Sequence, residues 1–152
     1  YIPLGNSEDK DLAMTLQQTR DYLEIMDRER NKLMKLKNNI TTISMNRALQ
    51  FQMTNDFAYG CTAGNTLLTI MENGDLVPCR RMPIIVGNLL KSTMYDLYEN
   101  NEILKELRKN KIPDECRNCE HSEMCHGGLK CLTYAMYNNL NHKDPGCNIN
   151  II

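Results

Sequence analysis

Seven cysteines are the residues of this chain with the clearest capacity for chemistry. They are Cys61, Cys79, Cys116, Cys119, Cys125, Cys131 and Cys147. Two residues separate Cys116 from Cys119, a spacing that lets two thiolates from one tight loop reach a single metal ion or cluster. Five residues separate Cys119 from Cys125, and five more lie between Cys125 and Cys131. This grouping predicts a metal centre with thiolate ligands.

Three kinds of cysteine chemistry compete for this pattern. A disulfide framework is disfavoured, because seven is an odd number and the N-terminus lacks the charged and apolar parts of a secretory signal. A zinc site would accept Cys116, Cys119, Cys125 and one later cysteine, but zinc ribbons usually pair two Cys-x-x-Cys knuckles and this chain has one. Iron–sulfur clusters are larger and can take loosely spaced cysteines from several loops. The spacing therefore favours clusters, with zinc as the rival.

Three histidines lie among or near these cysteines. His121, His126 and His142 are candidate ligands, because histidine replaces cysteine in some iron–sulfur and zinc sites. The alternative is that each is an ordinary solvated loop residue.

Two arginines and two glycines adjoin predicted ligands. Arg80 and Arg81 follow Cys79, where their charge could offset that of a thiolate-bound cluster or bind a peptide carboxylate, or could simply face solvent. Gly127 and Gly128 could let the backbone pass close to a cluster and donate amide hydrogen bonds to sulfur. Turn geometry alone explains the glycines equally well.

The composition bounds the size and partners of the protein. A chain of 152 residues with no Trp and two Phe can build one modest core, so bound metal could help to hold it together. The balance of 18 basic and 19 acidic residues, without a basic run, argues against nucleic acid as a partner. No apolar stretch approaches the roughly 20 residues that span a bilayer, so we expect a cytoplasmic protein with no membrane partner.

Local patterns predict the elements that must position the cysteines. Residues 15–37 read as an amphipathic helix that begins with a Thr15–Gln18 capping box, and residues 40–45 as a short strand. Residues 66–71 and 75–79 flank Asn73-Gly74 and predict a β-hairpin. We expect further helices after Ser92 or Thr93, over 103–109 and over 129–138, listed here in chain order. Residues 114–131 show little periodicity and need an external organiser.

The cysteine pattern as a whole resembles the SPASM domain, a C-terminal extension of radical S-adenosylmethionine enzymes. The resemblance covers about residues 55–150 and rests on a first cysteine (Cys61), a glycine five residues before a second (Gly74, Cys79), a four-cysteine group and a final cysteine. Gly87-Asn88 and the Cys-His-Gly-Gly sequence at 125–128 agree with it. One departure is the gap before Cys131, which is five residues here and usually three in the family.

The resemblance implies two auxiliary [4Fe–4S] clusters. The distal cluster would be held by Cys116, Cys119, Cys125 and Cys147, and the proximal cluster by Cys61, Cys79 and Cys131. The proximal cluster then lacks a fourth cysteine, so an iron would be open to substrate, water or a side chain such as Asp56 or Asp75. The implied fold class is α+β: a small β-hairpin, helices and cysteine-rich loops around two clusters.

The resemblance also implies a place in a larger enzyme. Residues 1–54 would be the last strand and helix of a partial (β/α) barrel with a linker, and residues 55–152 the SPASM domain. The Cys-x-x-x-Cys-x-x-Cys loop that binds a third cluster and cleaves S-adenosylmethionine is absent from these residues, and the chain starts with Tyr1 rather than Met. We therefore expect a piece of a longer oxidoreductase or maturase that is inactive by itself.

The expected partners are a ribosomally made peptide or protein and a reductant such as flavodoxin or ferredoxin. The family's reactions on such substrates are crosslinking, epimerisation and side-chain oxidation, and a pyrroloquinoline quinone precursor or a haem-related substrate would also fit. The alternatives from other classes are a non-enzymatic zinc-binding interaction module and a free-standing electron carrier.

Overall fold

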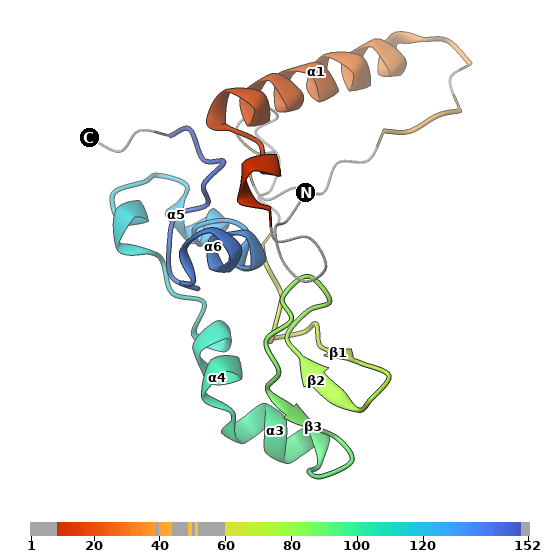
Figure 1. Ribbon diagram of the computed structural model, residues 1–152. Coiled ribbons are helices and arrows are strands. Elements are labelled where there is room, and N and C mark those ends of the chain that lie inside the picture. Colours follow the sequence, from red (N-terminus) through yellow and green to blue (C-terminus); the bar gives the residue numbers. More distant parts are fainter. Residues whose placement is uncertain (1–8, 39, 44–48, 50, 52–59, 150–152) are drawn as a thin grey trace.

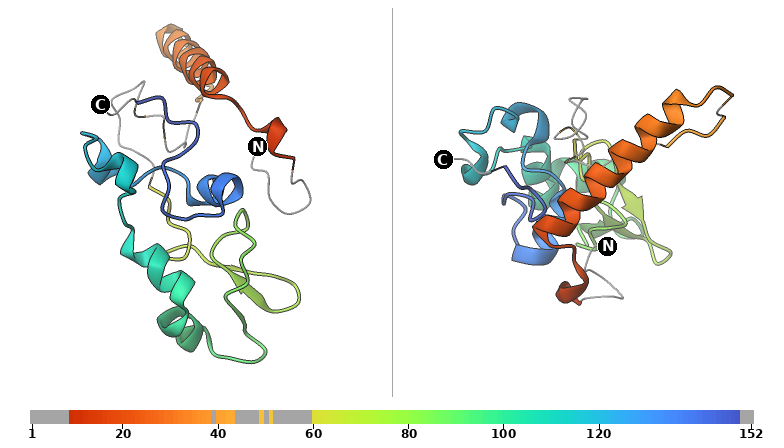
Figure 2. Two further views of the ribbon diagram at one scale, coloured as in Figure 1. Left: turned by 60° about the vertical axis from the view of Figure 1, so that its left-hand side comes forward. Right: turned by 90° about the horizontal axis from the view of Figure 1, so that it is seen from above.

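The computed structural model shows a mixed α+β chain with an elongated arrangement of its elements. It describes residues 9–38, 40–43, 49, 51 and 60–149. In these residues there are five α-helices, two short 3₁₀ helices (Lys10–Leu12 and Asp114–Cys116) and a three-stranded sheet. Helix α1 lies at one end, the sheet with helix α3 lies at the other, and α5 and α6 lie between them (Figure 1, Figure 2).

Helix α1 spans Leu16–Lys35 and begins where the sequence predicts. The Thr15 hydroxyl accepts the Gln18 backbone N–H at 3.2 Å, and the Gln18 side chain accepts the Thr15 N–H at 2.9 Å, which completes the capping box. Thr19 and Leu23 are its buried residues. Most of the helix is therefore exposed to solvent, and its N-terminal half packs against the rest of the chain.

The expected strand at 40–45 is wrong where it can be checked. Residues 40–43 form no strand, and residues 44–45 lie outside the described residues. Ile40 is 98% exposed. A β-branched run with neither a neighbouring strand nor a core face to cover has nothing to hold it in a sheet.

The predicted hairpin is confirmed and gains a third strand. β1 (Thr69–Ile70) pairs antiparallel with β2 (Asp75–Val77), and β2 pairs antiparallel with β3 (Gly87–Asn88). The turn is closed at Gly74, whose φ of 85° suits glycine. The Asp75 carboxylate accepts hydrogen bonds from the side chains of Asn73 and Asn88, so the turn and β3 are fixed together.

Two short helices follow the sheet. α3 (Met94–Asn100) is capped by Thr93, and α4 (Glu102–Lys109) by Asn101, whose side chain also donates to the Val86 carbonyl at 2.8 Å. α4 ends at Asn110, which adopts the left-handed conformation. Both helices lie where the sequence predicts them.

The cysteine-rich segment is more regular than its sequence suggests. It contains the 3₁₀ helix Asp114–Cys116 and the single-turn helix α5 (Ser122–Cys125) before α6 (Lys130–Tyr137). The last helix agrees with the expectation for 129–138. Two cysteines thus lie at the ends of short helical turns rather than in irregular loops.

Cysteines take part in the core. One buried cluster joins Leu23, Leu49 and Phe51 to Cys125, and a second joins Ala63, Met82 and Leu107 to Cys131. A third, formed by Leu76, Val86 and Leu104, holds the sheet against α4. Two of the three clusters are therefore built around a thiol. None of the helices in the described residues is long and apolar enough to cross a membrane.

Glu106 links α4 to the segment after α6, and its loss should weaken the fold. Its carboxylate accepts from Asn141 at 2.8 Å and pairs with Lys109 and Lys111, which lowers its pKa to about 2. We expect Glu106→Gln to lower the free energy of unfolding by about 1 kcal/mol at pH 7 in urea titrations.

The sign of the pH dependence follows from the lowered pKa. The contribution of Glu106 is complete above the unfolded-state pKa of 4.5 and shrinks as the pH falls towards 2, so the variant and the wild type should differ less at pH 4. Glu102→Gln is the control, because that side chain is 84% exposed and pairs with Lys105. Equal losses in the two variants would contradict the assignment.

Candidate metal centres

Three neighbouring cysteines and a distant fourth line one cavity. Cys116, Cys119, Cys125 and Cys147, here called the distal set, surround it together with Leu49, Phe51 and Ser122. Cys116 ends the 3₁₀ helix, and the Cys119 N–H donates to its carbonyl at 3.0 Å, so the Cys-x-x-Cys segment forms a tight turn. Cys125 ends α5. Short helical turns thus bring three thiols to the same place as the last cysteine.

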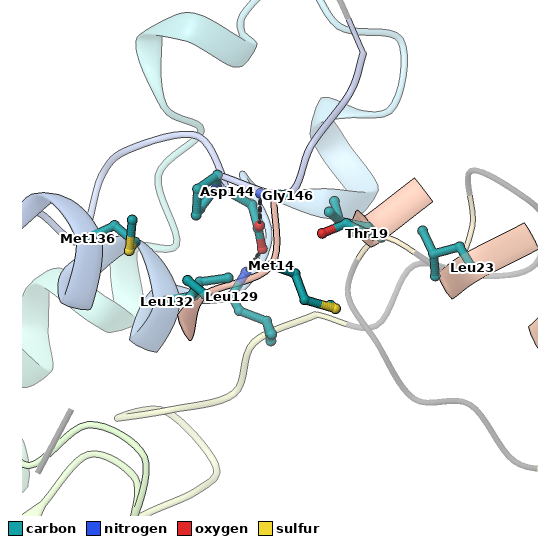
Figure 3. A pocket seen from close by; sticks show the side chains of 11 residues that line it. Met14, Thr19, Leu23, Leu129, Leu132, Met136, Asp144 and Gly146 are labelled. Carbon is teal, nitrogen blue, oxygen red and sulfur yellow. Dashed lines mark hydrogen bonds between the residues drawn. The ribbon is translucent and has the colours of Figure 1, made fainter. Parts of the chain in front are cut away.

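Hydrogen bonds of Asp144 hold the segment that places Cys147 at this cavity. Its buried carboxylate accepts the Leu129 N–H at 3.0 Å and the Gly146 N–H at 2.8 Å (Figure 3). Its own N–H donates to the Gly127 carbonyl, and its carbonyl accepts the Cys147 N–H, both at 2.9 Å. The final segment is therefore fastened to the residues that follow Cys125. Asp144 was missed in the sequence, where its only signal is an acid beside a Pro-Gly turn.

The other three cysteines meet elsewhere in the fold. Cys61 and Cys79 pack against the buried cluster that contains Cys131, and these three are here called the proximal set. The backbone N–H of Arg81 donates a hydrogen bond to the Cys79 sulfur at 3.5 Å. Met82, which is fully buried, accompanies them. The widened gap before Cys131 does not prevent that cysteine from joining Cys61 and Cys79.

Burial favours the protonated form of several of these thiols. It raises the pKa of Cys125 to about 11, with further increases from the charges of Cys147 and Asp144. Burial also raises the pKa of Cys131 to about 12, and the charges of Cys61 and Cys79 raise it further. The pKa of Cys116 is raised by burial as well. Binding as a thiolate would release these protons, so metal affinity here is linked to pH.

The inter-cysteine segment, residues 126–130, joins the two sets. A Cβ at Gly127 would overlap Pro113, and one at Gly128 would overlap the Asp144 side chain. Gly127 has a φ of 80° and Gly128 a φ of 85°. The Gly127 backbone lowers the pKa of the Cys125 thiol against the larger effect of burial. The contacts with Pro113 and Asp144 therefore explain why both positions need glycine.

Lys130 ends this segment and is buried. It is 5% exposed, and its Nζ donates to the His126 carbonyl at 2.9 Å. Burial lowers the pKa of Lys130, while the thiolate charges of Cys61, Cys116 and Cys125 oppose that change. The sequence pattern gave no reason to single out this lysine.

The three histidines have different surroundings. His142 stacks on Tyr137 and lies 3.1 Å from Glu115, and the His121 ring lies 4.8 Å from the Phe51 ring. His126 Nδ1 is a buried atom without a hydrogen-bond partner in the described structure. His126 is therefore the one whose ring nitrogen is open to a further ligand.

The candidate acidic ligands of the proximal set do not join it in the described residues. Asp75 is engaged in the hairpin turn by Asn73 and Asn88, and Asp56 lies outside the described residues. The positive charge of Arg81 lowers the pKa of the Cys131 thiol, against the larger effect of burial. Nothing in the structure assigns a role to Arg80.

A second cavity, of about 50 Å³, lies between α1 and α6. Met14, Leu23, Leu129 and Met136 line it, and Asp144 closes one side (Figure 3). Asp144, which holds the segment before Cys147, therefore lines this cavity together with residues of the N-terminal part of the chain.

The donor types suit iron–sulfur clusters. Each set offers thiols, the ligands that hold such clusters, and the distal set has the full four. Within the described residues, no group of three or more Cys, His, Asp or Glu side chains is arranged around a single metal ion. A cluster needs its thiolates around a larger volume, because different irons bind them.

Comparison with known proteins identifies similarity to iron–sulfur proteins. Residues 61–120 match the SPASM family, described as an iron–sulfur cluster-binding domain. An AdoMet-dependent heme synthase of Methanosarcina barkeri is 26% identical over 89 residues, which are 58% of this chain and 25% of that protein. A PqqA peptide cyclase of Xanthomonas oryzae is 29% identical over 89 residues, 55% of this chain and 24% of that protein. The chain thus matches about a quarter of these relatives.

A solved structure shows the same fold. It is anSMEcpe with bound AdoMet and the Cp18Cys peptide; it aligns with a TM-score of 0.61 at 18% identity and covers 97% of this chain and 43% of its own. Together with the family match and the two cysteine sets, these findings show that the chain carries a SPASM iron–sulfur cluster-binding domain and is related to radical S-adenosylmethionine enzymes.

Proposed function

We propose that this chain binds two [4Fe–4S] clusters, one through the distal set and one through the proximal set, as the auxiliary-cluster part of a radical S-adenosylmethionine enzyme. The observation that carries the proposal is the separation of all seven cysteines into two groups at two places in the fold. A zinc module would leave three buried or half-buried thiols without a function.

The protein supplies ligands, hydrogen bonds and shielding at each centre. Bound clusters would provide one-electron transfer to or from a substrate radical. The backbone N–H of Arg81 donates to the Cys79 sulfur at 3.5 Å, and such bonds raise the potential of a cluster. Leu49 and Phe51 cover the distal set and limit the access of water.

The substrate proposed for the whole enzyme is a ribosomally made peptide or protein. The support is that one relative is a peptide cyclase and that the solved relative holds a peptide. Crosslinking, epimerisation and side-chain oxidation are the candidate reactions, with flavodoxin or ferredoxin as the reductant. The match to a heme synthase keeps a haem-related substrate as the second candidate.

We propose the same division of the chain as the sequence suggests. Residues 1–54 would complete a partial barrel and residues 55–152 would form the cluster domain. Cleavage of S-adenosylmethionine would then take place on a third cluster outside these residues.

Replacing one cysteine ligand in either set should remove the cluster of that set and leave the other cluster bound. Anaerobically reconstituted wild-type chain should hold about eight irons and eight sulfides, as two four-iron clusters require. We expect Cys119→Ala and Cys79→Ala each to lose about half, with different clusters remaining in electron paramagnetic resonance spectra. Thr62→Ala, beside Cys61, is the matched control that should keep all the iron. Stoichiometric zinc without acid-labile sulfide would rule the proposal out.

Removing the carboxylate of Asp144 should release the distal cluster. Asp144→Ala leaves the buried N–H groups of Leu129 and Gly146 without their acceptors, which should cost about 2 kcal/mol or more of stability and displace Cys147. Iron assays should show a loss of about half. Asp114→Ala, at an 82% exposed side chain, should change neither quantity. Full iron and unchanged stability in Asp144→Ala would contradict this role.

The proximal cluster should have an iron that accepts an added ligand. Three cysteines form the proximal set, so a small thiol such as β-mercaptoethanol should bind the fourth iron and shift the spectrum of the reduced protein. The shift should persist in Cys119→Ala and vanish in Cys79→Ala. An unchanged spectrum at saturating thiol would mean that a protein side chain already fills the position.

A further inference from the structure

Lys130 is a buried cation at the junction of the two cysteine sets. It is 5% exposed, and its backbone adjoins Cys131 of the proximal set. Its ammonium reaches back to the carbonyl of His126, the residue after Cys125 of the distal set, at 2.9 Å. One side chain therefore runs from one set to the other inside the inter-cysteine segment.

The surroundings of this ammonium are incomplete without an anion. An ammonium has three donors, and within the described residues Nζ makes one hydrogen bond, to a neutral carbonyl, and no ion pair with a carboxylate. Burying an ammonium in this way is unfavourable unless negative charge lies close by. The groups whose negative charge would act on this ammonium, once they are thiolates, are cysteines of both sets: Cys61, Cys116 and Cys125.

We propose that Lys130 is a charge-compensating residue shared by the two clusters, and that its ammonium stabilises their reduced forms. This inference rests on the proposed binding of two clusters. A thiolate-ligated cluster is anionic, and reduction adds one negative charge to it. A fixed positive charge close to both centres favours that added charge and raises both reduction potentials.

A purely structural role predicts different behaviour. The hydrogen bond from Nζ caps the carbonyl of His126, where α5 ends. If capping were the whole function, removing the charge would change stability and leave the potentials of the retained clusters where they are.

Redox titration of three variants separates the two readings. The reconstituted chain is poised at a series of potentials and followed by electron paramagnetic resonance, with iron and sulfide assayed in each sample. We expect Lys130→Met to shift both cluster potentials to more negative values and Lys130→Arg to remain close to the wild type. Lys91→Met removes the same charge at an exposed position and should leave both potentials unchanged.

Each outcome bears on the proposal. Full iron with unchanged potentials in Lys130→Met would overturn it, and so would an equal loss of iron in the Met and Arg variants, which would point to packing. Loss of iron in the Met variant but not in the Arg variant would support charge compensation. A wild-type chain that takes up no iron and sulfide would instead overturn the two-cluster proposal, and this inference with it.

Discussion

The inter-cysteine segment, residues 126–130, is the constraint on which both centres depend. It leaves the distal set at Cys125 and enters the proximal set at Cys131, so any change in its path moves both. Three interactions fix that path: the Leu129 N–H bonds to the Asp144 carboxylate, the Asp144 N–H bonds to the Gly127 carbonyl, and Lys130 bonds to the His126 carbonyl. The Asp144 bonds also determine where Cys147 lies. A few hydrogen bonds around five residues thus position ligands of both sets.

The core of this protein is inseparable from its thiols. Cys125 and Cys131 each belong to a buried apolar cluster, and there is no Trp and little Phe to replace them. Buried cysteine packs as a small hydrophobe when protonated, which the raised pKa values of about 11 and 12 favour. Metal binding would replace that packing with bonds to iron, so the free energy of binding would add to the free energy of folding.

Sequence reasoning succeeded where the determinants are local. The Thr15 cap, the Asn73-Gly74 turn and the bounds of α4 and α6 each depend on residues within a few positions of one another. It failed where the partner is distant. β3 exists because β2 lies beside it, whereas residues 40–43 have no partner strand among the described residues. Asp144 escaped notice for the same reason, because its carboxylate accepts the N–H of Leu129, which lies far away in the sequence. Lys130 escaped notice because its burial, which distinguishes it from the other lysines, is a property of the fold.

Chain connectivity also limits how far apart the two centres can be. Six peptide units join Cys125 to Cys131, and even a fully extended chain of that length spans only about 20 Å. The actual path is shorter, because His126, Gly127 and Gly128 all have positive φ and turn the backbone. Motion of α1 or of the sheet cannot move the backbones of Cys125 and Cys131 apart beyond this limit. The protein therefore keeps the two cysteine sets within a fixed short range by covalent structure, and hydrogen bonds to Asp144 and from Lys130 determine their arrangement within it.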